Sequence, residues 1–413
     1  MSSISHDIHD IQDKNSTKIP AILTDTTISP NTNTTNLNAD KIFGWEDLDI
    51  CPELLRGIYS AGFEKPSPIQ QVAILPLLTG RDVIAQAQSG TGKTACFAIG
   101  VLSRIDISLN ELHAIVISPT RELSTQTKSV IDQLGNMMSG LCTMLVVGGT
   151  AINEMGRYTT AHVITGCPGR ISDMIRRKKI NVSKCRIVIF DEADELLTDG
   201  FRSQIYDIFQ FLPTTTQIAL FSATMPTEMN RITTKFLNNP VEVLVKSEKL
   251  TLDGIKQYYV ALNNDDSKYE TLKDIYGSLT VSQSIIYCNS IQRVQDLYNS
   301  MSNDNYPVCQ IHSGMSSTER SKVYEEFKTG KHRVLISSNI TARGIDIQQV
   351  STVINFDVPS CVHTYLHRIG RSGRWGRKGV GINFIVQRDN DIIKSIERYY
   401  NTTINELTTD WAS

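Results

Sequence analysis

The sequence predicts an α/β protein with two tandem domains, each a parallel sheet covered by helices. Three observations lead to this prediction. The chain has 413 residues, and a domain commonly contains about 100–200 residues. From Phe43 onward, short runs rich in β-branched residues alternate with helical patterns. These runs are apolar almost throughout, as expected for parallel strands that are covered by helices on both faces.

The expected strands fall into two sets. The first set is Asp82–Ala85, Ala114–Ile117, Thr143–Val147, His162–Thr165, Ile187–Phe190, Ile218–Phe221 and Val241–Val245. The second set is Gln257–Ala261, Ser284–Tyr287, Val308–Ile311, Val334–Ser337, Ser351–Asn355 and Gly381–Ile385. We therefore expect a disordered polar tail over residues 1–40, a first domain over 41–245, a linker over 246–254 and a second domain over 255–413.

Composition excludes several classes of protein. The net charge is −2, so any nucleic-acid site has to be a local patch rather than the whole surface. The eight cysteines form no C-x-x-C pair, which argues against a zinc site and for a reducing compartment. The first residues lack the pattern of a secretory signal, and no apolar run approaches the roughly 20 residues of a membrane span. We expect a cytoplasmic protein without membrane contacts.

A glycine-rich segment, Ala87–Thr94, follows the first expected strand and precedes a helical pattern. Small residues let backbone N–H groups close around phosphate oxygens, and the helix N-terminus adds partial positive charge. We expect Lys93 to reach the β- and γ-phosphates of ATP and the Thr94 hydroxyl to hold Mg²⁺. The alternative, a turn that ends in Lys-Thr by chance, is disfavoured by the strand–loop–helix context. The loop residues that precede Lys93 are also expected to bind ATP, and they are Ser89, Gly90, Thr91 and Gly92.

The expected strand Ile187–Phe190 ends in the acidic box Asp191-Glu192-Ala193-Asp194. A carboxylate just past a strand end faces the ligand crevice of an open α/β sheet. We expect Asp191 to hold Mg²⁺, largely through water, and Glu192 to accept a proton from the attacking water. The alternative is a solvated helix start, where carboxylates suit the helix dipole.

Two further signals lie downstream. Ser222 and Thr224 follow an apolar strand, so their hydroxyls are candidates for hydrogen bonds to the acidic box, although Ser-Ala-Thr alone is a weak signal. The segment His367–Arg374 is dense in arginine and glycine. Guanidinium groups bind phosphate in bidentate fashion, so Arg371 and Arg374 are candidates to neutralise charge on a transferring γ-phosphate. The alternative is a basic turn that touches nucleic acid.

Together these residues resemble the DEAD-box RNA helicases, whose fold is two RecA-like domains, over about residues 43–404. Gly62–Gln70 is similar to the adenine-reading Q motif of that family, with Trp45 at its upstream aromatic position. The resemblance implies that Gln70 reads the adenine edge and that Phe63 stacks on the adenine ring. An amide is able to bond an adenine edge in bidentate fashion, which agrees with this role.

The resemblance also implies roles for shorter motifs. The residues implied to grip the RNA backbone are Pro119, Thr120, Arg121, Gly149, Gly169, Arg170, Asn289, Arg293, Gly314 and Arg343. Those implied to couple ATP to RNA are Asp194, Ser222, Thr224, His367 and Arg368. Gly344 and Asp346 are implied to contact the nucleotide, and Arg371 and Arg374 to act as arginine fingers. Contacts to phosphates and sugars give RNA affinity without sequence specificity.

Four positions depart from the family pattern. Cys167 replaces the Thr of Thr-Pro-Gly-Arg, Ser338-Asn339 stands where Thr-Asp is usual, and Ser317 stands where Gln is common. Each change alters a polar group near the RNA path or the domain interface. We therefore expect the departures to affect the strength of RNA coupling rather than the ATP chemistry.

Within the family, several phrases are similar to the subfamily of eukaryotic translation initiation factor 4A, among them Leu54–Tyr59 and Gln204–Phe209. This implies a monomeric helicase that unwinds RNA in translation initiation, with a scaffold protein as partner. An ATP-dependent RNA clamp in mRNA processing, with little unwinding, is the alternative. Arg176–Lys179 is either a nuclear-localisation patch or, more commonly for such a run, a solvated helix end.

Overall fold

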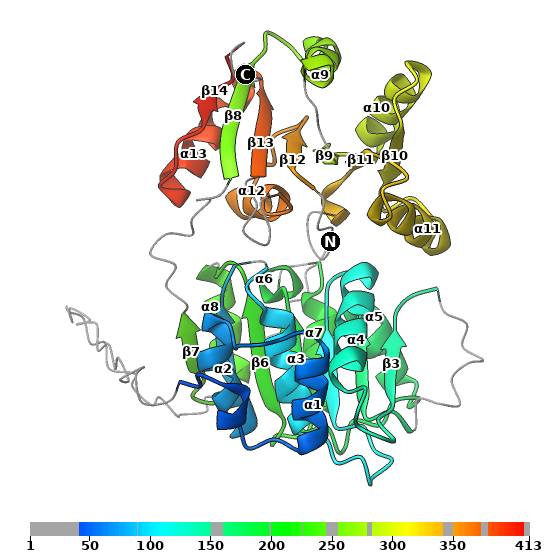
Figure 1. Ribbon diagram of the computed structural model, residues 1–413, viewed down its shortest axis with the longest axis vertical. Helices are drawn as coiled ribbons and strands as arrows, with labels where there is room; N and C mark the ends of the chain where they lie inside the picture. Colours follow the sequence, from blue (N-terminus) through cyan, green and yellow to red (C-terminus); the bar gives the residue numbers. More distant parts are fainter. Residues whose placement is uncertain are drawn as a thin grey trace, which may run out of the picture. The chain divides into compact units, whose positions relative to one another are not determined.

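The computed structural model describes residues 41–88, 90–149, 160–197, 200–225, 227–244, 255–278, 283–341, 350–372 and 379–408 (Figure 1). The expected tail over 1–40 and the expected linker over 246–254 lie outside these residues. Within them, two parallel sheets of seven strands each are present, each covered by helices, as the apolar runs predicted.

The first sheet has the strand order β3-β4-β2-β5-β6-β1-β7, and every pairing in it is parallel. Its strands are β1 Val83–Gln86, β2 Ala114–Ile117, β3 Thr143–Val146, β4 Val163–Gly166, β5 Ile187–Asp191, β6 Gln217–Ser222 and β7 Val241–Leu244. Its helices are α1 Pro52–Ser60, α2 Pro68–Leu78, α3 Lys93–Ser103, α4 Arg121–Leu134, α5 Pro168–Arg176, α6 Ala193–Leu196, α7 Arg202–Phe211 and α8 Thr227–Phe236.

The second sheet has the order β10-β11-β9-β12-β13-β8-β14, again with parallel pairings. Its strands are β8 Ile255–Ala261, β9 Ser284–Tyr287, β10 Val308–Ile311, β11 Val334–Ser337, β12 Thr352–Asn355, β13 Gly379–Ile385 and β14 Asn405–Glu406. Its helices are α9 Ser267–Ser278, α10 Ile291–Asn303, α11 Ser317–Lys328, α12 Val362–Ile369 and α13 Asn390–Tyr400. Among the described residues, 3₁₀ turns lie at Trp45–Asp47 in the first half and at Asn339–Thr341 and Gln387–Asp389 in the second. Counted from its own first strand, each sheet has the same order, so the two halves repeat one topology.

Successive side chains of a strand point to opposite faces of the sheet, and in these sheets both faces are covered by helices. In β2, Ala114 and Val116 pack on one side with α1, α2 and α3, whereas Ile115 and Ile117 pack on the other with α5 and α7. A strand with two buried faces needs apolar side chains at every position, which is why these strands read as continuous apolar runs. The arrangement places the carboxyl ends of β1, β5 and β6 along one sheet edge, where ligands of such folds bind.

The structure differs from the sequence-based expectation at the far edge of the second sheet. The strand β14 has only two residues, Asn405 and Glu406, and both are exposed. No apolar run marks it, so it was not among the expected strands. Among the described residues, no helix combines the length and apolar character that crossing a bilayer requires.

Candidate nucleotide and RNA site

The phosphate loop connects β1 to α3. Gly92, at the N-cap of α3, adopts a left-handed conformation with φ of 95°. A Cβ atom there would lie 2.6 Å from Nε2 of Gln70, so both the backbone and the space require glycine. Lys93 is buried, and its ammonium donates to the Ala87 carbonyl at 2.7 Å. The lysine thus lies folded along the inside of the loop where phosphate is expected. Ser89 lies outside the described residues.

Helix α2 clamps this loop from outside. The Ser67 hydroxyl donates to the Thr91 carbonyl at 2.8 Å, and Nε2 of Gln70 donates to the Gly92 carbonyl at 3.0 Å. Oε1 of Gln70 accepts from the Ser67 N–H at 2.7 Å. Gln70, which the resemblance assigns to adenine, therefore also positions the phosphate loop. Ser67 was not singled out in the sequence, because its partner lies 24 residues away.

The aromatic residues of the adenine motif divide into two roles. Trp45 is fully buried, and its indole N–H donates to the Phe63 carbonyl at 2.9 Å. A side chain without exposed surface contacts no ligand, so the structure places Trp45 behind Phe63 in the core rather than on the nucleotide surface. Phe63 itself is partly exposed, as the stacking role requires.

The acidic box begins at the end of β5. Burial, and next the neighbouring charge of Glu192, raise the pKa of Asp191, while the Lys93 ammonium acts in the opposite direction. Glu192 is buried and left-handed, with φ of 52°, at the N-cap of α6. A non-glycine residue in this region stores about 1–3 kcal/mol of strain, and such residues cluster at active sites.

The donor set at this edge fits Mg²⁺. Asp191 and Thr94 offer oxygen ligands, which hard divalent cations prefer. Burial and the neighbouring charge of Glu192 raise the pKa of Asp191 more than the Lys93 ammonium lowers it, so a divalent cation beside Asp191 would offset unfavourable negative charge. When bound, Mg²⁺ would neutralise charge on the phosphate oxygens.

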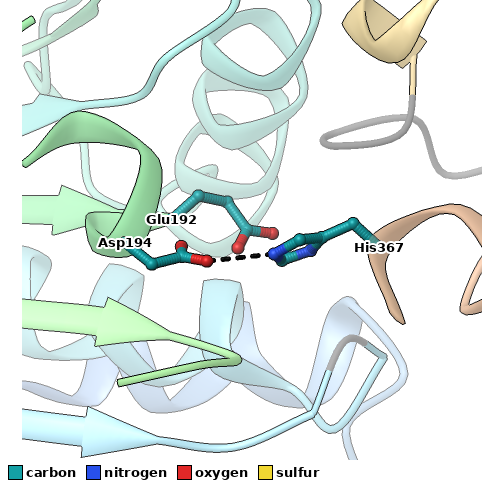
Figure 2. A group of neighbouring side chains, drawn as sticks. All are labelled: Glu192, Asp194 and His367. Carbon is teal, nitrogen blue, oxygen red and sulfur yellow. Dashed lines mark hydrogen bonds and ion pairs between the residues drawn. The ribbon is translucent and has the colours of Figure 1, made fainter. Parts of the chain in front are cut away.

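Asp194, the last acid of the box, joins residues from both halves of the chain. Its Oδ2 accepts from the Thr224 hydroxyl at 2.6 Å. The same oxygen accepts from Nε2 of His367 at 3.0 Å (Figure 2). All three side chains are buried. The Ser222 hydroxyl accepts from the Thr224 N–H at 3.3 Å and so orients Thr224. Four residues predicted to couple ATP to RNA are therefore in contact.

His367 lies on α12 with Arg368, and Arg371 follows that helix directly. Arg371 is buried, and its Nε donates to the His367 carbonyl at 3.1 Å. Arg374, the other predicted finger, lies outside the described residues, as do Arg343, Gly344 and Asp346. Arg368 has no exposed surface and belongs to a network inside the second half.

On the RNA side of the first half, Thr120 caps α4 by accepting from the Leu123 N–H at 3.2 Å. The Arg121 guanidinium donates to the Gly148 carbonyl, and Gly149 follows with φ of 81°. Arg170 pairs with Asp173 at 3.4 Å near the start of α5. These predicted contacts thus lie on helix starts and turns, where backbone N–H groups are open to phosphate.

Cys167 is the N-cap of α5 and makes no side-chain hydrogen bond to that helix. Its Sγ instead lies 3.7 Å from the Ser124 hydroxyl on α4. Burial raises the pKa of this thiol to about 11, so it is neutral at physiological pH. Residues Pro119, Thr120, Arg121, Glu122, Cys167, Glu195, Phe201, Arg320, Asn339 and Thr364 line one cavity of about 500 Å³.

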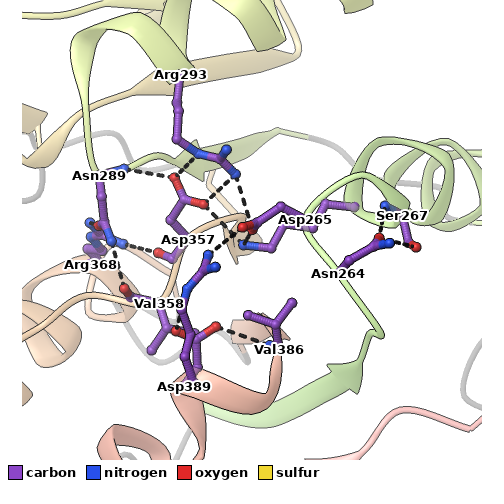
Figure 3. A network of polar contacts seen from close by, with 12 residues as sticks. Asn264, Asp265, Ser267, Asn289, Arg293, Asp357, Val358, Arg368, Val386 and Asp389 are labelled. Atoms are coloured by element: carbon purple, nitrogen blue, oxygen red, sulfur yellow. Dashed lines mark hydrogen bonds and ion pairs between the residues drawn. The ribbon is translucent and has the colours of Figure 1, made fainter.

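In the second half, a polar network surrounds Asp357 (Figure 3). Its carboxylate accepts from Nε and Nη2 of Arg293 at 2.7 Å each and from the Asn289 N–H at 3.1 Å. Lys268, only 1% exposed, adds an ammonium at 3.1 Å. These cations hold the pKa of Asp357 below its usual value despite burial. Arg293, predicted to bind RNA, therefore also anchors this network, with 37% of its side chain exposed.

Neither Lys268 nor Asp357 was predicted from the sequence, because they lie 89 residues apart and only the fold brings them together. Gly314, which the resemblance assigns to RNA, lies in a turn after β10, where its N–H donates to Nδ1 of His312 at 3.2 Å.

Comparisons with known proteins agree with this geometry. Residues 67–232 match the DEAD/DEAH box helicase family, and residues 267–376 match the Helicase conserved C-terminal domain. The chain is 46% identical to ATP-dependent RNA helicase fal1 of Schizosaccharomyces pombe, across 91% of this chain and 95% of the relative. It is 47% identical to ATP-dependent RNA helicase eIF4A of the same species, across 90% and 95%. The solved structure of S. cerevisiae Dbp5 bound to RNA and ADP BeF3 is similar with a TM-score of 0.84 and 36% identity, across 89% of this chain and 96% of that one.

Proposed function

This chain belongs to the DEAD-box family of ATP-dependent RNA helicases, and from this premise we propose that it unwinds short RNA duplexes during translation initiation. The contact that supports ATP-dependent RNA unwinding is the hydrogen bond from His367 to Asp194. It joins the acidic box of the first half to the arginine-bearing helix α12 of the second.

The residues of the first half bind and prepare ATP. The loop from Ala87 to Thr94 surrounds the phosphates, and Lys93 leaves its contact with the Ala87 carbonyl to meet them. Glu192 is fixed at a helix N-cap, close to the strand end, where it takes a proton from the attacking water. Arg371 brings positive charge to the phosphoryl group in the transition state.

RNA enters this scheme through the contacts around Asp194. RNA phosphates favour the arrangement in which Thr120, Arg121 and Arg170 of the first half and Arg293 of the second all contact one strand. In that arrangement His367 is held against Asp194, and Arg371, one turn later, is held near the phosphates. ATP turnover therefore requires RNA, and hydrolysis releases it.

The test is ATP hydrolysis with and without RNA, compared between the wild type and Glu192→Gln. We expect RNA to stimulate the wild-type rate, and the amide to lower the stimulated rate by on the order of 10²–10⁴-fold because it accepts no proton. Binding of Mg-ATP and RNA should persist in Glu192→Gln. Glu242→Gln, a change of the same kind at an exposed position of β7 outside the cavity lining, is the control and should retain activity. RNA-independent turnover by the wild type would overturn the helicase proposal.

The cellular role is the finer part of the proposal. The chain is almost equally similar to the relatives named eIF4A and fal1. The proposal of a role in translation initiation therefore rests on the sequence segments that resemble the initiation factor 4A subfamily. We infer a cytoplasmic protein that works with a scaffold protein. Depletion followed by polysome profiling tests this: loss of polysomes at constant mRNA level supports it. Intact polysomes with unprocessed mRNA would favour the RNA clamp instead.

A further inference from the structure

Arg368 is an arginine buried without a carboxylate. All five of its N–H donors are used, and each acceptor is a neutral oxygen. They are Oδ1 of Asn339 at 2.9 Å from Nε and 2.5 Å from Nη2, Oδ1 of Asn355 at 3.1 Å, the Asp357 carbonyl at 2.7 Å and Oδ1 of Asn289 at 2.7 Å. Its guanidinium carbon lies 5.2 Å from the centre of the Tyr287 ring. Burial lowers the pKa of Arg368 to about 10, so it stays charged at neutral pH.

The nearest acid in the described part does not neutralise this charge. The Asp357 carboxylate is committed to Arg293 and Lys268, and only its backbone carbonyl meets Arg368 (Figure 3). At position 339, where the family pattern has aspartate, this chain has asparagine. The positive charge of Arg368 is therefore held in place by amides without being cancelled by them.

The three amides around Arg368 are not equivalent. Nδ2 of Asn289 donates to the Val358 carbonyl at 2.8 Å, and Nδ2 of Asn355 donates to Oδ1 of Asn383 at 2.8 Å. A carboxylate at either position would face another oxygen. For Asn339, Oδ1 must face the two Arg368 donors, so Nδ2 points away from them. Asn339 is exposed, and within the described residues no protein acceptor for this Nδ2 is found.

Asn339 also lines the cavity of about 500 Å³ next to Thr120, Arg121 and Arg320. The charged residues of that lining are Arg121, Arg320, Glu122 and Glu195, two of each sign. With asparagine at 339 the lining is formally neutral and borders the charge of Arg368. With aspartate the carboxylate would pair with Arg368 and cancel its charge, so a phosphate in the cavity would meet one uncancelled positive charge fewer.

We propose that Asn339 is an RNA-binding residue of this chain: it positions Arg368 through Oδ1 and donates Nδ2–H to an RNA phosphate oxygen in this cavity. The proposal rests on the RNA-binding function proposed above and adds a specific contact to it. An amide in place of an acid keeps both hydrogen bonds to Arg368, leaves the charge of Arg368 uncancelled and adds a donor. It offsets the weaker donor at Cys167, which lines the same cavity.

Asn339→Asp tests the proposal, because the carboxylate keeps the acceptor for Arg368, removes the donor and cancels the charge of Arg368. We expect binding of single-stranded RNA, with an ATP analogue present and at one fixed salt concentration, to weaken about tenfold or more, as for loss of a hydrogen bond to a charged group. The thermal midpoint should not fall, since the Arg368 hydrogen bonds become charge-assisted. ATP affinity without RNA should be unchanged.

The control is Asn303→Asp, which makes the same chemical change at an exposed position at the end of α10 and should leave RNA affinity unchanged. Equal or tighter RNA binding by Asn339→Asp would overturn the proposal. Weaker ATP affinity without RNA would also overturn it, because the phosphate would then belong to the nucleotide. If the wild type itself binds no RNA, the proposed function fails first, and the two failures are thereby distinguished.

Discussion

At the scale of single residues, cysteine occupies three helix N-caps: Cys51 before α1, Cys167 before α5 and Cys361 before α12. None makes a side-chain hydrogen bond to its helix, because a thiol is a weak acceptor compared with a hydroxyl. Pro168 at the first helical position partly compensates for the missing cap of α5.

Cys167→Thr should therefore restore a cap and raise the free energy of unfolding by about 0.5–2 kcal/mol. It should also tighten RNA binding several-fold, since the hydroxyl is a better donor to phosphate than the thiol. Urea unfolding and RNA titration measure the two effects. Cys51→Ser is the control, because it repairs a cap far from the predicted RNA residues. The predicted effect on RNA affinity would be contradicted if Cys51→Ser also bound RNA more tightly, or if Cys167→Thr bound RNA no more tightly than the wild type.

At the same scale, His113 and His162 precede adjacent strands β2 and β4 and are buried. Nδ1 of His113 accepts from the Asp106 N–H, and Nδ1 of His162 accepts from the Cys142 N–H. Both acceptors require the neutral ring. Burial is the main cause that lowers the pKa of each histidine below its usual value of 6.5.

The unfolded chain therefore binds more protons than the folded one as pH falls through about 6.5, and the free energy of unfolding must decrease with acidification. Below the folded-state pKa values, this loss levels off. Urea unfolding at pH 7.5 and pH 5.5 measures it. The double variant His113→Asn and His162→Asn keeps both acceptors without titrating, so its stability should depend less on pH. Equal pH dependence in the two proteins would assign the acid sensitivity to other groups.

At the scale of elements, the strands were predictable from the sequence, whereas contacts between elements that are distant in the chain were not. Thirteen of the described strands coincide with expected strands. Central strands such as β2 and β5 are buried on both faces and leave an apolar run in the sequence, whereas the two exposed residues of β14 leave none. The phosphate loop was also predictable, since its glycines and Lys93 are adjacent in sequence. The hydrogen bond from Ser67 to the phosphate loop and the three asparagine amides around Arg368 were not predicted, because the residues in contact are distant in the chain.

The clamp yields a prediction for the phosphate loop as an element. Gly92→Ala places a Cβ atom 2.6 Å from Nε2 of Gln70 and also strains a left-handed backbone. We expect Mg-ATP affinity to fall by tenfold or more, because the loop must separate from α2. Gly90→Ala is the matched control: its φ is 80°, but the added Cβ meets nothing within 4 Å. Calorimetric titration should show a larger loss for Gly92→Ala, and equal losses would mean that backbone strain alone matters.

At the scale of the whole molecule, the duplicated topology explains why one chain couples two ligands. Each half has the same strand order, yet only the first carries the phosphate loop, and only the second carries the arginines of α12 and the turn after it. Under the proposed function, a complete hydrolytic site therefore needs both halves. Asp194 accepts hydrogen bonds from Thr224 of the first half and His367 of the second, so we propose it as the contact that couples the two ligands.

His367→Ala should lower the RNA-stimulated rate of ATP hydrolysis by tenfold or more, because Arg371 is no longer held through its helix against the first half. ATP affinity without RNA should stay unchanged, since Lys93 and the phosphate loop are intact. His363→Ala, one turn earlier on α12 and packed on Tyr399 with ring centres 5.3 Å apart, is the control and should retain stimulation. In a double-mutant cycle with Asp194→Asn, the two losses should not add, as expected for residues in direct contact. Additive losses would mean that His367 acts on hydrolysis by a route that does not pass through Asp194.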